Sequence, residues 1–265
     1  MIVAAMVMEK GGVGKTTTAL ELAFGLARNE RRVLMLDLDP QAKLANGLGL
    51  RRRIDASRPN LYHVLVDEVP IAEAVVAAPS KSACGRIDVV PGHRAMERVK
   101  DALEGKHEPE PQRALERALH VLAEEHPERY EFVIVDCPPS LGFLTVTALL
   151  AADYTVIPTQ THQQAVDGYP ETIDLIERAR RRNPKLKVVG TLPTQYRRTN
   201  ADKEAIALLE QDFAARVLDP ISLSVRFTEA YSGGISIADY DRDASEGYEK
   251  LTDRFLALLS EPVPA

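Results

Sequence analysis

A short glycine-rich run near the start of the chain holds the residues best suited to chemistry. It reads Glu-Lys-Gly-Gly-Val-Gly-Lys-Thr-Thr over residues 9–17 and follows an apolar stretch. Glycines let the backbone turn so that successive N–H groups point at phosphate oxygens, and a following helix presents its positive end to them. We therefore predict a phosphate-binding loop. Its predicted nucleotide-binding residues are Lys10, Gly11, Gly12, Val13, Gly14, Lys15, Thr16 and Thr17.

Two residues of this loop have specific predicted roles. We expect Lys15 to reach the β- and γ-phosphates of a nucleotide, and the hydroxyl of Thr16 to bind Mg²⁺. The strict pattern of such loops places glycine at position 9, where this chain has Glu9. The loop is therefore a variant, and its distinguishing residue is a second lysine, Lys10, five positions before Lys15.

Three carboxylates follow two later apolar runs. Asp37 and Asp39 lie in Leu-Asp-Leu-Asp-Pro-Gln, residues 36–41, and Asp136 follows Phe-Val-Ile-Val, residues 132–135. Open parallel sheets bind ligands beyond the carboxyl ends of their strands, which is where these runs end. We expect Asp136 to hold Mg²⁺ as the aspartate of a Walker B motif.

Elements of an α/β fold position these residues. Short apolar runs alternate with stretches of helical period, and continuous rather than alternating hydrophobicity indicates strands buried on both faces. Strands are predicted at 2–8, 32–38, 87–90, 132–135, 154–157 and 186–192. Helices are predicted at 16–28, 111–125, 143–151, 166–182, 202–215 and 245–259, and surface loops at 47–59 and 105–111. The fold class is a mostly parallel twisted sheet with helices on both faces, and no composition shift divides residues 1–265 into two domains.

Composition excludes several classes of protein. The 265 residues are 45% hydrophobic and 27% charged, which disfavours disordered, collagen-like and coiled-coil chains. The net charge of −6 leaves nucleic-acid binding to local basic patches. Cys84 and Cys137 are too few for a disulfide framework or a structural zinc site. The low cysteine content fits a reducing cytoplasm, and because no run of about eighteen apolar residues occurs, we expect a protein that does not cross a membrane.

The three motifs, in this order, resemble those of the deviant Walker A ATPases of the ParA/MinD group, whose loop reads KGGxGK[ST]. The resemblance extends to about residue 259 and favours the short ParA/Soj-type DNA-partitioning ATPases, because no helix-turn-helix segment precedes the loop. It implies a P-loop NTPase fold with ATP and Mg²⁺ as cofactors. In that family Lys10 would reach the phosphates bound by a partner subunit, Asp39 would orient the attacking water, and Asp37 would lie near the metal. The alternatives are a solvated loop carboxylate for Asp39 and a helix cap for Asp37.

Basic residues gather in the second half of the chain. By resemblance we expect Arg197, Arg198 and Arg226 to contact DNA, whereas the basic group at 178–187 fits DNA contact and a helix dipole equally well. The stretch at 223–234 resembles a family segment near the nucleotide base, and Pro193 is expected near the base as well. Ser-Leu-Ser at 222–224 departs from the Pro-Arg-Asn common in the family, so the base contacts of this chain are not predicted.

The resemblance implies a nucleoid-associated homodimer that sandwiches two ATP molecules, binds DNA without sequence preference and drives chromosome or plasmid partitioning by slow hydrolysis. A ParB-like centromere-binding protein would stimulate hydrolysis. Three alternatives remain: a MinD-like or cargo-positioning ATPase acting on a membrane or protein adaptor, an electron-transfer ATPase like the nitrogenase iron protein, and a nucleotide-dependent scaffold without catalysis. Acidic residues mixed into the amphipathic segment 248–259 argue against stable membrane association.

Overall fold

A seven-stranded sheet forms the centre of the molecule. The computed structural model describes residues 1–50, 54–55, 57–79, 86–161, 168–212 and 216–260. The strand order is β3-β4-β2-β5-β1-β6-β7, and all neighbouring strands are parallel except β3 and β4. The strands are β1 Ile2–Met6, β2 Val33–Asp37, β3 Val76–Ala77, β4 Ile87–Val90, β5 Phe132–Asp136, β6 Tyr154–Gln160 and β7 Lys187–Thr194.

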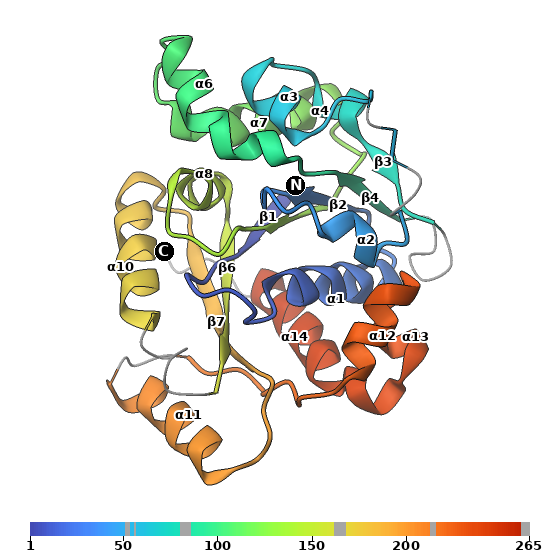
Figure 1. Ribbon diagram of the computed structural model, residues 1–265, viewed down its shortest axis with the longest axis vertical. Helices are drawn as coiled ribbons and strands as arrows, with labels where there is room; N and C mark the ends of the chain where they lie inside the picture. Colours follow the sequence, from blue (N-terminus) through green and yellow to red (C-terminus); the bar gives the residue numbers. More distant parts are fainter. Residues whose placement is uncertain (51–53, 56, 80–85, 162–167, 213–215, 261–265) are drawn as a thin grey trace.

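Helices cover both faces of the sheet and give the molecule two apolar layers (Figure 1). One layer lies under α1 Lys15–Arg28, α2 Leu44–Gly47, α12 Arg226–Gly233, α13 Ile237–Tyr240 and α14 Arg242–Ser260. The other lies under α3 Leu61–Val66, α4 Ile71–Ala74, α6 Val99–Gly105, α7 Ala114–Glu125, α8 Phe143–Ala151, α10 Tyr169–Arg182 and α11 Asn200–Asp212. Two 3₁₀ helices, η1 Arg94–Arg98 and η2 Pro111–Arg113, precede α6 and α7.

The predicted fold class is confirmed, and each predicted strand and helix has a counterpart at or near its expected bounds. Sequence periodicity missed β3 and the short helices α2, α3, α4, α6, α12 and α13. Most of these span only a turn or two, which is too little chain for a repeating apolar pattern to emerge. The predicted loop at 47–59 begins at the last residue of α2, and its residues 51–53 and 56 lie outside the described part of the chain.

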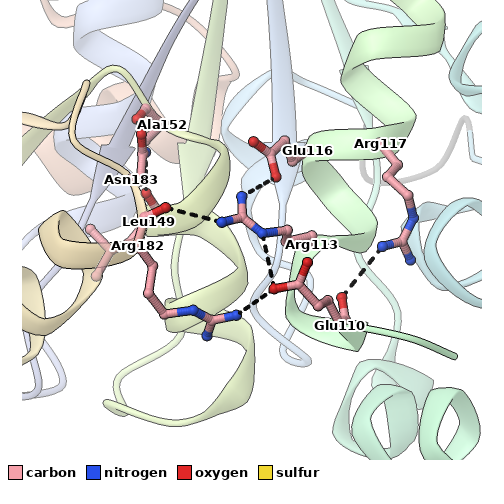
Figure 2. Close-up of polar contacts among 8 residues, drawn as sticks. All are labelled: Glu110, Arg113, Glu116, Arg117, Leu149, Ala152, Arg182 and Asn183. Atoms are coloured by element: carbon pink, nitrogen blue, oxygen red, sulfur yellow. Dashed lines mark hydrogen bonds and ion pairs between the residues drawn. The ribbon is translucent and has the colours of Figure 1, made fainter.

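A polar network joins the start of α7 to the end of α10 (Figure 2). A guanidinium nitrogen of Arg113 donates to the carbonyl of Arg182 at 3.0 Å, and the same side chain pairs with Glu110 and Glu116 at 3.4 and 2.6 Å. Arg182 in turn pairs with Glu110 at 3.2 Å, and Asn183 donates to two carbonyls at the end of α8. The network therefore fixes α7, α8 and α10 relative to one another on one face of the sheet.

In the described portion of the chain, no helix combines the length and the apolar composition that a membrane span requires.

Candidate functional site

The predicted phosphate loop connects β1 to α1 at the carboxyl edge of the sheet. Its backbone turns through Gly12 and Gly14, whose φ angles of 75° and 88° lie in the left-handed region that favours glycine. Gly14 is also the N-cap of α1, and it offers no side chain to the first N–H groups of the helix. These donors therefore remain open to an anionic ligand, and the helix dipole favours negative charge there.

Lys15 is held inside the loop by two main-chain oxygens. Its ammonium donates to the carbonyl of Met8 at 3.0 Å and to the carbonyl of Lys10 at 2.7 Å, and the residue is only 6% exposed. Burial lowers the pKa of Lys15, while the nearby carboxylates of Asp136 and Asp39 partly restore it. Carbonyl oxygens do not neutralise an ammonium, so the positive charge remains available to a phosphate at the mouth of the loop.

Asp136 ends β5 beneath the loop, and its buried carboxylate is poorly satisfied by hydrogen bonds. It is 1% exposed, and neither carboxylate oxygen accepts a well-formed hydrogen bond from any described residue. Burial raises the pKa of Asp136 to about 7, Asp39 adds to this, and Thr16 and Lys15 oppose it. A buried carboxylate without partners is costly unless a cation accompanies it. The orphaned oxygens beside Thr16 therefore fit an oxygen-ligated cation such as Mg²⁺.

Asp37 and Asp39 lie side by side with Asp136 but are held differently. The register pairs Asp37 with Asp136 across β2 and β5. Asp37 is fully buried and accepts the N–H groups of Asp39 and Leu44 at 3.1 and 3.0 Å, and burial next to Asp136 raises its pKa well above the usual range. Asp39 is partly exposed and accepts the N–H of Gln41 at 2.9 Å. Asp37 thus anchors the turn into α2, although the N-cap of that helix is Lys43, whereas Asp39 lies on the partly exposed side.

A cleft of about 520 Å³ opens above these residues. It is lined by most of the phosphate loop, by the turn after β2 and by segments of the second half of the chain. The lining residues are Gly11, Gly12, Gly14, Lys15, Thr16, Thr17, Asp39, Gln41, Lys43, Cys137, Pro139, Thr194, Gln195, Ile221, Ser222, Leu223, Ser224, Phe227, Thr228 and Tyr248. Residues more than two hundred positions apart in the sequence therefore face one cavity.

Three predicted nucleotide-binding residues lie outside the cleft lining. Val13 is buried within the loop, and Pro193 is buried in β7, where its carbonyl accepts the N–H of Ile221 at 2.8 Å. Lys10 is exposed, and its side chain lies against Gly168, where a Cβ would be 2.9 Å from Lys10 Cε.

Sequence reasoning missed two glutamines that hold the loop from the side. The side-chain amides of Gln160 and Gln195 both donate to the carbonyl of Gly12, at 2.9 and 2.8 Å. Next to them, the hydroxyl of Thr194 donates to the carbonyl of Val13 at 2.8 Å. Their place in the sequence could have indicated this role, because these residues end or follow the strands β6 and β7, whose carboxyl ends lie at the same edge of the sheet as the loop.

The predicted DNA-binding arginines differ in how their charges are balanced. Arg197 and Arg198 are exposed, and neither guanidinium forms an ion pair with a described carboxylate. Arg226 begins α12 and pairs with Glu229 at 3.4 Å and with Asp241 at 3.5 Å. In the group at 178–187, three arginines are paired with acidic residues, namely Arg178 with Asp174, Arg180 with Glu177 and Arg182 with Glu110. These three guanidiniums are therefore already paired with carboxylates.

The sequence is similar to those of known proteins. A family described as "AAA domain" matches residues 1–188. The "Chromosome partitioning protein ParA" of Caulobacter vibrioides is 38% identical over 254 residues, covering 94% of this chain and 91% of that protein. The "Sporulation initiation inhibitor protein Soj" of Bacillus subtilis is 33% identical over 252 residues, covering 94% of each.

A solved structure extends the likeness to three dimensions. Cobyrinic acid a,c-diamide synthase from Mycobacterium smegmatis, crystallised with bound ADP and magnesium, superposes with a TM-score of 0.81 at 28% identity and covers 98% of this chain and 96% of its own. With this fold, and with close relatives over nearly its whole length, the chain belongs to the ParA/Soj family of P-loop partitioning ATPases.

Proposed function

We propose that this chain is an ATP-dependent, dimerising ATPase that binds DNA non-specifically in its ATP state and drives chromosome or plasmid partitioning by slow hydrolysis. One observation supports this most directly: the phosphate loop, Asp39 and the buried Asp136 lie together at the carboxyl edge of the sheet, where the cleft opens. The whole chain from 1 to 265 acts in this proposal as a single ATPase domain.

The loop and the carboxylates beside it provide for nucleotide and metal. Gly12 and Gly14 aim backbone N–H groups at phosphate oxygens, and Lys15 adds a positive charge. Thr16 and Asp136 offer oxygen ligands for Mg²⁺, with Asp37 behind them. When bound, Mg²⁺ neutralises charge on the phosphates of ATP.

The catalytic residues in the proposal are Lys10, Lys15 and Asp39. Of the three carboxylates Asp37, Asp39 and Asp136, Asp39 is the one that lines the cleft, so it can hold and orient a water molecule there. Lys10, exposed at the loop, contributes its ammonium to the nucleotide of a second subunit in the manner of an arginine finger. Pro193 is proposed to act near the base only through the adjoining Thr194 and Gln195, which reach the cleft.

DNA contact is assigned to Arg197 and Arg198, with a smaller contribution from Arg226. The guanidiniums of Arg197 and Arg198 can neutralise phosphates without first breaking an ion pair, whereas that of Arg226 is already paired. Because such contacts are made to phosphates and not to bases, the affinity is independent of sequence and sensitive to salt. Partitioning is supported by the similarity to the chromosome partitioning protein ParA of Caulobacter vibrioides. Association with the nucleoid in the cytoplasm and stimulation by a ParB-like protein are further parts of the proposal, and they rest on the family resemblance. We do not expect the protein to associate stably with a membrane.

The test is retention of a non-specific DNA duplex by the purified protein with ATP, ADP or no nucleotide, at two salt concentrations. We expect retention only with ATP, weaker at the higher salt, and lost in Lys15→Gln. Asp39→Ala should preserve retention while abolishing ATP turnover, because it leaves the nucleotide-binding residues intact. ATP-dependent dimerisation without DNA retention in any state would overturn the DNA part and redirect the search to membranes and protein cargo.

A further inference from the structure

A buried carboxylate organises the loop that carries Arg197 and Arg198. Asp202, near the start of α11, is 5% exposed. One of its oxygens accepts the N–H of Arg197 at 3.0 Å, and the N–H and hydroxyl of Thr199 at 2.9 and 2.8 Å. The other accepts the hydroxyl of Thr161, which follows β6. Burial by itself would raise the pKa of Asp202, but these hydrogen bonds outweigh it and lower the pKa to about 2. The group is therefore a permanent anion and acts only as an acceptor.

The arginine loop has a conformation that needs such an anchor. Gln195 and Arg198, which bracket Arg197, have φ angles of 54° and 64°. Residues other than glycine are uncommon in this left-handed region and persist there only when surrounding contacts impose it. Main-chain hydrogen bonds join Tyr196 to Ile221 and Leu223 at the start of this loop, and the hydrogen bonds to Asp202 hold the backbone on either side of Arg198.

The same loop is joined to the phosphate loop. Gln195, two residues before Arg197, donates to the carbonyl of Gly12, and so does Gln160, the residue before Thr161. The strands that carry the two glutamines, β6 and β7, are neighbours in the sheet. A peptide of the phosphate loop is thus connected, by two side chains and one buried carboxylate, to the unpaired arginines at the surface.

We propose that Asp202 is a positioning residue that holds the loop of Arg197 and Arg198 in one conformation and couples it to the phosphate loop through Gln160 and Gln195. Nucleotide binding that changes the Gly12 peptide then changes the order of the arginine loop, because the two share hydrogen-bonded partners. The consequence for DNA rests on the proposed function; the coupling itself does not.

Asp202→Asn tests the anchor with a nearly isosteric change. The amide keeps one acceptor oxygen but turns an NH₂ group toward donors, so part of the cluster loses its partner. Asp174→Asn is the matched control, since it removes an exposed carboxylate whose partner is Arg178 on α10, away from the loop. Both variants are compared with the wild-type protein by thermal unfolding, so that a general loss of folding is recognised.

The first readout does not depend on DNA. Trypsin cleaves after Arg197 and Arg198, and mass spectrometry follows those two products with and without ATP. We expect ATP to change the cleavage rate in the wild type, and Asp202→Asn to raise the rate several-fold and remove the ATP effect, with Asp174→Asn like the wild type. Cleavage that is indifferent to ATP in the wild type, or unchanged in Asp202→Asn, overturns the proposal.

The second readout is a double-mutant cycle on ATP-dependent DNA retention. Asp202→Asn should weaken retention about tenfold, which is the cost of ordering about one backbone residue on binding. The same substitution should have no effect in an Arg197→Ala/Arg198→Ala background, since it acts only through those arginines. An equal loss in both backgrounds overturns the positioning role. If the wild type retains no DNA while the tryptic result holds, the proposed function fails and the positioning role stands.

Discussion

The phosphate loop and the arginine-rich second half of the chain differ in how their positive charges are held, and net charge does not show this difference. The phosphate loop places Lys15 within a turn of two glycines, and its ammonium contacts only carbonyl oxygens. The arginines of α10, by contrast, are paired with acidic neighbours on the surface. Between these extremes, Arg197 and Arg198 are exposed but held by a structured backbone. A cation is available to a phosphate where the backbone fixes it and no carboxylate already neutralises it.

The largest expected effect tests the first region. Lys15→Gln should reduce ATP turnover and nucleotide affinity by at least about 100-fold, because the loop loses the charge aimed at the phosphates. Lys43→Gln is the control, since Lys43 also lines the cleft but is exposed on the turn before α2. Binding of a fluorescent ATP analogue and release of phosphate measure both. Equal losses in the two variants would show that general cleft charge, and not the loop, sets affinity.

The second prediction concerns the unpartnered carboxylate beneath the loop. Asp136→Asn should stabilise the nucleotide-free protein by about 1–2 kcal/mol, because a buried charge next to Asp37 and Asp39 disappears. The variant should also lose the extra stabilisation that Mg²⁺ gives to the ATP-bound protein. Urea unfolding without nucleotide, and melting with ATP in Mg²⁺ or EDTA, check the two effects.

Asp88→Asn provides the contrast for this experiment. Asp88 in β4 accepts a hydrogen bond from Tyr130 at 2.5 Å, so its replacement should lower stability and leave the Mg²⁺ effect unchanged. If Asp136→Asn behaves like Asp88→Asn, the Asp136 carboxylate is a structural group and the metal assignment is lost.

The phosphate-loop region was predictable from sequence because its functional side chains and the glycines that shape its backbone lie in one short segment. Gly12, Gly14 and Lys15 have a fixed spacing between a strand and a helix, and Asp136 follows a run of four apolar residues that forms β5. Parallel strands bring such endings to one edge, so the site assembles from local signals. The role of Asp37 was less predictable, because an aspartate at this position of the sequence could either lie near a metal or anchor the following turn.

The second half was harder to predict because its contacts are long-range. Nothing in the sequence indicates that Gln160 and Gln195 share one carbonyl of the phosphate loop, or that Asp202 bonds Thr161. The fate of each arginine is likewise decided by which carboxylate folding brings near it, as with Arg182 and Glu110, 72 residues apart. Charge clusters counted along a sequence therefore overestimate the cations that a partner can use.

The third prediction compares unpaired and paired arginines directly. Arg197→Ala/Arg198→Ala should lower ATP-dependent DNA affinity about tenfold and reduce the slope of log affinity against log salt by about 2. Arg178→Ala/Arg180→Ala removes the same formal charge but from pairs with Asp174 and Glu177, so its effect should be much smaller. DNA retention titrated over a range of salt measures both. Equal slopes in the two variants would place the contact surface on α10 instead.

The smallest effect is expected at Arg226, whose guanidinium lies between Glu229 and Asp241. Arg226→Ala should weaken DNA retention about twofold, because phosphate must compete with carboxylates already present. Glu229→Gln should have the opposite effect and strengthen retention, but only while Arg226 is present, since the gain comes from releasing that guanidinium. The double variant Arg226→Ala/Glu229→Gln therefore separates release of a cation from simple loss of a negative charge. If Glu229→Gln strengthens retention equally without Arg226, the local ion pairs do not govern which arginines reach DNA, and total surface charge does.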